Sequence, residues 1–369
     1  MSQINTNAIL DASGGTTTSI NGYTPTASNM AGRNRIINGD MRIDQRNAGA
    51  SVTPAQDNFI ADRFKWGQSQ ASKFTSQQST TAPAGFTNSL LLTVTSAVTL
   101  GASDYFSAYQ PIEGFNVADL AWGTASAQAV TLSFKVRSSL TGTFGGVFRN
   151  ASGTRSYPFT YTISAANTFE DKTITIPGDT AGTWLTNNGV GLFVQWGLGV
   201  GTTFSGTAGA WASANYLSAT GATSVVGTSG ATFYITGVQL EAGSVATPFE
   251  HRQYGQELAL CQRYFETYSN GTGTGSIFEG LGGYFANSSL FRTAVPFKVT
   301  KRASPSISVP VTYVTVNSSA GNLTPSSAGS NFSSPDGATI SCTVSGATGG
   351  QGGTVGFSSS APVTISAEL

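Results

Sequence analysis

The chain has 369 residues, of which only 10% are charged, and its 18 basic and 18 acidic side chains give a formal net charge of zero. Nucleic-acid-binding proteins normally carry a basic excess that neutralises phosphates, so we expect no nucleic-acid partner. No stretch approaches the roughly 20 apolar residues of a membrane span, and no secretory signal pattern opens the chain. We therefore expect synthesis in a cytoplasm, without membrane insertion.

Hydrophobic residues make up 39% of the chain and aromatic residues 11%, which is enough to bury a core and argues against general disorder. The 45 glycines, together with frequent serine and threonine, are typical of many short strands joined by tight turns. The composition predicts an all-β fold.

Residues 1–35 show little hydrophobic pattern. They are expected to form either an extended N-terminal arm that docks to a larger particle or a flexible terminus. From Arg35 the pattern changes, and RIINGDMRIDQR predicts a strand, a turn at Asn38–Gly39 and a second strand with Met41 and Ile43 on one face.

Residues 36–250 contain nine further strand-like runs, each rich in β-branched or aromatic residues and bounded by turn formers. In the run at 129–138, hydrophobic residues at even positions from Val130 to Val136 alternate with polar ones, so one face is buried. These runs predict a jelly-roll-like antiparallel sandwich. They span 61–66, 89–96, 104–112, 129–138, 142–150, 157–164, 171–177, 190–201 and 231–241.

A linker helix is predicted at 251–269, with an apolar stripe at Leu258, Cys261, Phe265 and Tyr268. This stripe either packs on its own sandwich or forms an oligomer contact between chains. Residues 270–369 then predict a second, C-terminal β domain with six strands. Its strands are polar and poor in charge, so their edges favour pairing between protomers. The Gly/Ser segments at 270–276 and 326–334 are predicted to be exposed loops.

The sequence offers little for catalysis or metal binding. Cys261 and Cys342 show no metal-ligand spacing, and we expect Cys261 to be a buried free thiol, although a disulfide stays open. His251 is the single histidine and lies between charged residues, which is typical of a surface site. Carboxylate pairs such as Asp104 with Glu113 are conceivable for glycoside hydrolysis but match no motif. We predict no enzyme, no cofactor and no metal.

Three ordered segments carry a resemblance to a known group of proteins: NRIINGDMRIDQRNAGASVT with NFIADRFKW (34–66), GVQLEAGSVATPFEHRQYGQELALCQRYFE (237–266) and the terminal ISAEL. Together they resemble phage and prophage tail-fibre proteins. The resemblance covers about residues 34–369 and implies a virion location, a role in host attachment and commonly a homotrimer. The first 33 residues lie outside it, so they would contact other particle proteins.

A second resemblance is to the carbohydrate-binding jelly rolls of polysaccharide-degrading enzymes. The NGDM segment (38–41) is similar to an element of their first strand, and FYITGVQLE (233–241) to their last strand. In those modules an acidic residue on the last strand helps to hold a structural calcium. Thr236–Gly237 stands at the corresponding place here, which puts the ion in doubt.

Sugar binding is the chemistry that the aromatic residues favour, because ring faces stack on sugar CH groups. Trp184, Trp211 and Tyr216 lie in connections rich in Gly, Ser, Thr and Asn, and they are the candidate glycan-binding residues. An alternative role for them is to cover a loop. The other tryptophans lie in or beside apolar strands and are predicted core residues: Trp66, Trp122 and Trp196.

The sequence thus predicts a homotrimeric tail-fibre or receptor-binding protein of a virion, which attaches to host-surface glycans through several weak contacts. The alternative is a head fibre, decoration or tail-adaptor protein without receptor binding. A polysaccharide depolymerase is a third class, but no fixed repeat period of the kind that β-helical depolymerases show is present.

Overall fold

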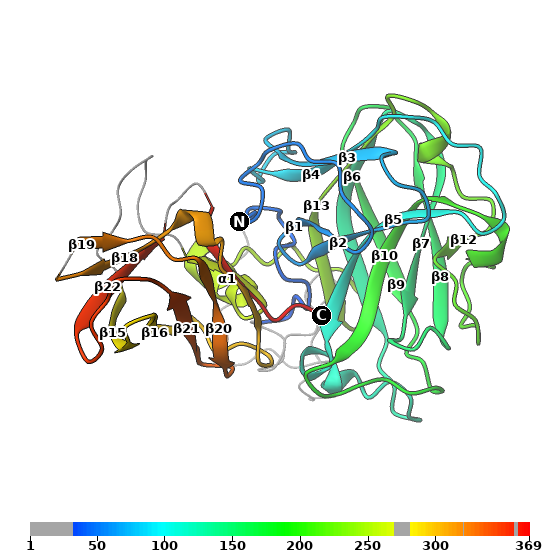
Figure 1. The fold of residues 1–369 in the computed structure, drawn as a ribbon. Coiled ribbons are helices and arrows are strands. Elements are labelled where there is room, and N and C mark those ends of the chain that lie inside the picture. The colour runs from blue at the N-terminus through cyan, green and yellow to red at the C-terminus, as the bar shows by residue number, and fades with distance from the viewer. Residues whose placement is uncertain (1–31, 269–280, 320, 358–360) are drawn as a thin grey trace, which may run out of the picture. The chain divides into compact units, whose positions relative to one another are not determined.

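The structure is a computed structural model that describes residues 32–268, 281–319, 321–357 and 361–369 (Figure 1). The chain divides into two compact units. Unit 1 consists of the described residues up to Arg42 together with Gly49–Ile60 and Phe64–His251; unit 2 consists of Ile43–Ala48, Ala61–Arg63 and the described residues of Arg252–Leu369. The predicted N-terminal arm lies outside the described residues, except for 32–35.

Unit 1 contains a six-stranded sheet in the order β1-β2-β5-β10-β7-β8 and a five-stranded sheet in the order β3-β4-β13-β6-β9 (Figure 1). A small parallel pair, β11-β12, accompanies them. The strands are β1 Phe59–Ala61, β2 Phe64–Gln68, β3 Phe74–Ser79, β4 Ser89–Val94, β5 Tyr105–Glu113, β6 Val130–Ser138, β7 Gly142–Arg149, β8 Ser156–Ile163, β9 Glu170–Ile176, β10 Val190–Val200, β11 Ser205–Gly206, β12 Ser218–Ala219 and β13 Thr232–Ala242. Short 3-10 turns lie at Gly114–Asn116, Ala118–Leu120, Thr202–Phe204 and Val225–Gly227.

Aromatic rings from the two sheets meet in the core of unit 1. Phe134 on β6 lies 5.7 Å from Trp196 on β10, measured between ring centroids, and Trp66 on β2 lies 4.8 Å from Phe74 on β3. Strand β6 buries its even-numbered hydrophobic residues, as its alternation predicts. The antiparallel sandwich is confirmed, and so is the burial of the three tryptophans predicted for the core, which are at most 7% exposed.

The hairpin predicted for residues 35–46 is wrong. The turn at Asn38–Gly39 exists, but the flanking residues form no strand. Asn38 and Met41 have φ angles of 59° and 58°, in the left-handed region that a strand does not use. The apolar side chains of Met41 and Ile43 are nevertheless buried, at 0% and 1% exposed, so their alternation reflects burial and not strand pairing.

Unit 2 contains a seven-stranded antiparallel sheet in the order β19-β18-β22-β15-β16-β21-β20 and a three-stranded sheet in the order β14-β23-β17. Its buried core includes Phe285, Phe291, Ile340 and Phe357. The elements are α1 Tyr254–Gln262, β14 Phe265–Tyr268, β15 Leu281–Asn287, β16 Leu290–Pro296, β17 Ser306–Ser308, a 3-10 turn Val311–Tyr313, β18 Val314–Ser318, β19 Gly321–Leu323, β20 Ser327–Ser333, β21 Gly337–Thr343, β22 Gly352–Phe357 and β23 Val363–Ser366.

Helix α1 is shorter than the sequence predicts. It ends at Gln262, and Phe265–Tyr268 forms β14, which pairs antiparallel with β23. Phe265 and Tyr268 therefore do not continue a helical stripe with Leu258 and Cys261, because ladder hydrogen bonds to β23 replace the helical ones. Cys261 and Phe265 are buried, and Tyr268 packs edge-on against the ring of Phe357. A contact of these residues with another chain stays a prediction.

The segment at 326–334 is also not a loop, since Ser327–Ser333 forms the edge strand β20. The companion candidate at 270–276 lies outside the described residues. Both cysteines are buried free thiols, and burial raises the pKa of each. Within the described ranges, no helix has the length and hydrophobicity needed to cross a membrane.

Unit 2 also buries charged groups. Lys301 Nζ lies 3.2 Å from a carboxylate oxygen of Glu266, and both side chains are fully buried. Lys301 also donates a hydrogen bond to the Gln262 carbonyl, and its burial lowers the pKa of its ammonium group. The segments 43–48 and 61–63 bind this unit through Arg46 and Arg63, which both pair with Glu368.

Candidate functional site

A groove of about 190 Å³ lies on the outer face of the six-stranded sheet of unit 1. Strands β2, β5 and β10 form the floor, with Gly67 opposite Ser107 and Gln195 opposite Tyr109 in the β-ladders. The Gln195 amide donates a 2.9 Å hydrogen bond to the Ser107 hydroxyl. The floor therefore consists of small and polar side chains, and regular sheet structure holds it in place.

Glycine at position 67 keeps this floor open. A Cβ atom at Gly67 would lie 3.0 Å from the Ser107 hydroxyl oxygen and 3.4 Å from the Tyr109 ring, which is tighter than ordinary van der Waals contact. Any larger side chain there would enter the groove.

Aromatic rings and amides form the walls. Tyr105 packs edge-on against Phe204 with ring centroids 5.7 Å apart, and Asn215 and Leu217 precede β12 beside them. Gln56, from the loop before β1, also lines the groove. The groove thus combines ring faces with planar hydrogen-bonding groups, the two elements that a sugar ring requires.

Asp57 contributes the single carboxylate among the residues that line the groove. Its backbone has a φ angle of 63°, and its N–H donates to the Trp66 carbonyl at 2.8 Å, which holds the side chain beside β5. The Tyr109 hydroxyl donates a 2.5 Å hydrogen bond to Asp57 Oδ1. Burial and this hydrogen bond raise the pKa of Tyr109, so its hydroxyl stays protonated.

Arg149 closes one end of the groove from the C-terminus of β7. Its guanidinium carbon lies 4.0 Å from the centroid of the Phe193 ring, and its Nε donates a long 3.4 Å hydrogen bond to Gln195 Oε1. Burial lowers the pKa of Arg149. The guanidinium is stacked in a fixed plane at a site with reduced access to water.

The glycan-binding residues predicted from the sequence lie elsewhere in unit 1. Trp184 and Trp211 pack edge-to-face with Trp122, with ring centroids 4.7–5.5 Å apart. Their indole N–H groups donate to backbone carbonyls, those of Ala181 and Pro177 respectively. Both rings are half-buried. Tyr216 is separate from this triad and lies close to Gly206, next to the groove residues Asn215 and Leu217. Sugar contact by these three residues stays a prediction.

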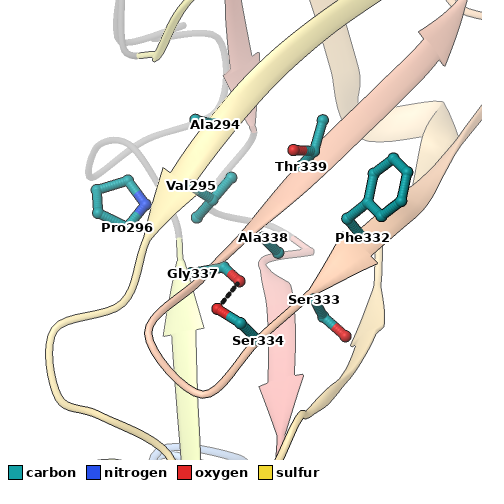
Figure 2. A pocket seen from close by; sticks show the side chains of 9 residues that line it. All are labelled: Ala294, Val295, Pro296, Phe332, Ser333, Ser334, Gly337, Ala338 and Thr339. Atoms are coloured by element: carbon teal, nitrogen blue, oxygen red, sulfur yellow. Dashed lines mark hydrogen bonds between the residues drawn. The ribbon is translucent and has the colours of Figure 1, made fainter.

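Unit 2 has a second open surface, a trough on the outer face of β15, β16, β20 and β21. Figure 2 shows its main cavity, of about 690 Å³, which a neighbouring cavity of about 350 Å³ adjoins. Phe332 lies opposite Thr339 and is 73% exposed, while Tyr284 is 52% exposed. The Ser334 hydroxyl hydrogen-bonds the Gly337 carbonyl in the turn that borders the cavity (Figure 2). The trough is wide and mainly apolar, so it lacks the convergent polar groups of the groove.

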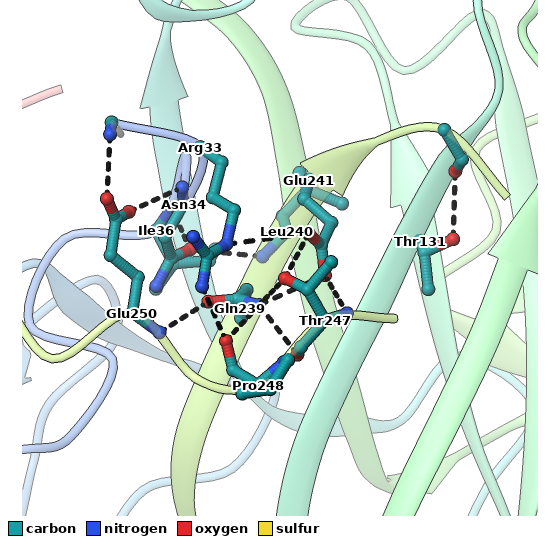
Figure 3. Close-up of polar contacts among 12 residues, drawn as sticks. Arg33, Asn34, Ile36, Thr131, Gln239, Leu240, Glu241, Thr247, Pro248 and Glu250 are labelled. Atoms are coloured by element: carbon teal, nitrogen blue, oxygen red, sulfur yellow. Dashed lines mark hydrogen bonds and ion pairs between the residues drawn. The ribbon is translucent and has the colours of Figure 1, made fainter. Parts of the chain in front are cut away.

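A polar clasp is formed by residues 32–36 with 239–250 (Figure 3). Glu250 accepts hydrogen bonds from the N–H groups of Gly32 and Asn34, at 2.7 and 2.9 Å. Glu241 accepts from Thr247 and lies 3.8 Å from Arg33 Nε. These carboxylates thus already have protein partners.

Three carboxylates outside the clasp were candidates for metal binding or catalysis: Asp40, Asp104 and Glu113. The Asp40 carboxylate forms an ion pair with Arg42. Within the described ranges, no three His, Cys, Asp or Glu side chains gather closely enough to hold a metal ion. Asp104 and Glu113 lie at opposite ends of β5, roughly 30 Å apart at about 3.4 Å per residue. This separation is too large for glycoside hydrolysis by that pair.

No protein-family model matches the chain, and no curated protein matches it. Solved structures that are similar include the enzymatically active domain of tailspike protein 4 of bacteriophage CBA120, at 14% identity and a TM-score of 0.32; the match covers 57% of this chain and 21% of that one. This chain therefore spans about a fifth of the tailspike.

Two sugar-binding structures are similar over their whole length. The family 11 carbohydrate-binding module from Clostridium thermocellum, in complex with a β-1,3-1,4-mixed-linked tetrasaccharide, is 12% identical with a TM-score of 0.26, covering 54% of this chain and 97% of that one. A structure from Bacteroides thetaiotaomicron, described as that of a putative sugar binding protein, is 10% identical with a TM-score of 0.31, covering 57% of this chain and 100% of that one. These TM-scores all lie below 0.5.

Proposed function

We propose that this chain is a glycan-binding attachment protein of a phage virion and that the groove of unit 1 is its binding site. The observation that carries this proposal is the combination of a glycine and serine floor, aromatic walls at Tyr105 and Phe204, and planar polar groups such as Gln195 in a space the size of one sugar ring. Binding sites of this kind need little rearrangement, because sheet strands hold their floor in place.

The virion location and the homotrimer rest on the resemblance of the sequence to tail-fibre proteins. Three linked copies would present three grooves, so weak individual contacts to a repetitive glycan would add through avidity. Sedimentation equilibrium should give three times the 37.9 kDa chain mass, and a mass of one chain would contradict the trimer.

We further propose that the groove binds sugars without cleaving them. Glycoside hydrolysis generally uses two carboxylates that flank the scissile bond, and Asp57 is the single carboxylate among the groove residues. Incubation of the protein with a bound polysaccharide should leave its chain length unchanged, and any shortening would overturn this part of the proposal.

The groove is tested by filling it. Gly67→Val places methyl groups over the floor, so we expect at least tenfold weaker binding on an array of bacterial surface glycans. Gly282→Val is the matched control, because a Cβ atom at Gly282 on the outer face of β15 meets nothing within 4 Å. Thermal unfolding of both variants checks that they fold. Equal binding by wild type and a folded Gly67→Val variant, or no binding to any glycan, would overturn the proposed site.

A further inference from the structure

Arg149 has no carboxylate in direct contact with its guanidinium, unlike Arg35 and Arg155 of the same unit. Arg155 binds Asp179 through two hydrogen bonds of 2.6 and 2.7 Å, and Arg35 binds Asp119 in the same bidentate way. Arg149 makes one long hydrogen bond to Gln195, and no carboxylate of the described chain lies within 4 Å of it. The sandwich thus pairs Arg35 and Arg155 with carboxylates, whereas Arg149 and Arg137 are stacked on aromatic rings and have no carboxylate of the described residues within 4 Å.

The stacking on Phe193 fixes the plane of the Arg149 guanidinium. A guanidinium has five N–H donors, of which one is used here, so its remaining donors are available at the groove. Burial of this cation outweighs the attraction of the more distant Asp57 carboxylate and lowers the Arg149 pKa. A bound anion at the guanidinium would offset this cost of desolvation. A planar guanidinium matches a carboxylate through two parallel hydrogen bonds, a geometry that a sugar hydroxyl cannot provide.

The other charges around the groove also bear on which anion fits. Asp57 is negative, but its Oδ1 atom already accepts the short hydrogen bond from Tyr109. Lys65 lies in the same outward row of the sheet as Tyr109, with its Nζ 5.9 Å from that ring. Asp57 would repel a second carboxylate at its own side of the groove. A ligand with one acidic group would therefore place that group at Arg149 and its neutral hydroxyls toward Asp57.

We propose that the groove selects a carboxylate-bearing sugar, such as a uronic acid unit of a polysaccharide, and that Arg149 binds its carboxylate. This inference rests on the proposed function, because it names the class of sugar that the same groove takes. The aromatic walls contact the ring of the sugar, Gln195 and Asp57 hydrogen-bond its hydroxyls, and Arg149 distinguishes an acidic sugar from the neutral sugar of the same shape.

The test is isothermal titration of the full chain with three matched probes: an oligogalacturonate, its methyl ester and the corresponding galactose oligomer. We expect the oligogalacturonate to bind at least tenfold more tightly than the two neutral probes, with a preference that shrinks as salt rises. Arg149→Gln should remove the preference, and Arg149→Lys should restore part of it. Arg137→Gln is the matched control, since Arg137 is stacked 4.9 Å from the Tyr234 ring on the other sheet.

The outcomes separate the two proposals. Equal binding of acidic and neutral probes, abolished by Gly67→Val, would overturn the acidic selectivity and leave the groove as a glycan site. Tight binding of a sugar phosphate but not of the uronate would overturn the carboxylate assignment in the same way. An acidic preference that survives Arg149→Gln would overturn the role of Arg149. Binding of all probes unaffected by Gly67→Val would overturn the proposed site itself.

Discussion

The two units are built from one charge-poor sequence, yet they stabilise their interiors differently. Unit 1 packs aromatic rings between two sheets, and its buried Glu241 carboxylate accepts hydrogen bonds from uncharged groups of Thr247 in the clasp. Unit 2 encloses an ion pair, Lys301 with Glu266, in which neither side chain reaches solvent. A carboxylate held by uncharged donors leaves no opposite charge behind when it is neutralised, whereas a buried ion pair leaves a desolvated charge when one partner is removed. Single charge changes should therefore affect unit 2 more than unit 1.

The distribution of tryptophan allows the two units to be followed separately. All five tryptophans of the chain lie between residues 66 and 211, within unit 1. Tryptophan emission therefore reports the unfolding of unit 1, while far-ultraviolet circular dichroism reports strands of both units.

The largest effect is expected at the buried ion pair of unit 2. Glu266→Gln leaves the Lys301 ammonium buried without its counter-charge, which should destabilise unit 2 by about 3–5 kcal/mol. In denaturant unfolding, part of the circular dichroism change should move to lower denaturant while the tryptophan transition stays in place. The double variant Glu266→Gln with Lys301→Met should recover much of the loss. An unshifted unfolding curve for the single variant would contradict the contrast between the units.

A smaller effect is expected at the clasp of unit 1. Glu241 is 3% exposed and accepts hydrogen bonds from the Thr247 N–H and hydroxyl, at 2.8 and 2.7 Å. Glu241→Gln replaces one acceptor oxygen with a donor facing these groups, so we expect a loss of about 1–3 kcal/mol in the tryptophan-monitored transition. Asp171→Asn is the control: its 76% exposed side chain pairs with Lys135, and the change should be within about 0.5 kcal/mol. Equal effects of the two changes would mean that the clasp adds no stability.

The smallest effect is expected on the trough of unit 2. Phe332 is 73% exposed, so Phe332→Ser should change stability by no more than about 0.5 kcal/mol, measured by circular dichroism. Phe291→Ser is the comparison, because the Phe291 ring is fully buried and its loss should unfold unit 2. A loss for Phe332→Ser that depends on protein concentration would contradict the prediction and indicate that a second copy covers this face.

Much of the fold of unit 1 could be predicted, because most of its strands alternate apolar and polar residues between turn formers. Strand β3 was not predicted, since its sequence FTSQQS has only one apolar residue. It forms a strand because it pairs with β4 along its whole length. The segment at 35–46 was wrongly predicted to form strands, because its buried side chains alternate as they do in a strand. Residues in the left-handed region, such as Asn38, prevent strand pairing there.

The groove could not be predicted from the sequence for a different reason. Tyr105, Ser107 and Tyr109 alternate along one predicted strand, which marks an outward face. Their meeting with Gln195 depends on the register between β5 and β10, which includes irregularities at both ends. Asp57 reaches them from a loop. Sequence patterns therefore favoured Trp184 and Trp211, in the connections between strands, as candidate glycan-binding residues. In the structure these two tryptophans pack in a triad with Trp122.

The clasp has a mechanical consequence. Gly32 and Asn34 hydrogen-bond Glu250, and Arg35 donates from its N–H to the Leu240 carbonyl at 2.8 Å, so the first described residues of unit 1 are tied to its last ones. A pulling force applied to the chain before Gly32 would act first on these clasp hydrogen bonds. The strands of the two sheets would come under shear only after the clasp had opened. The sandwich could then keep the groove intact under a pull that opens the clasp.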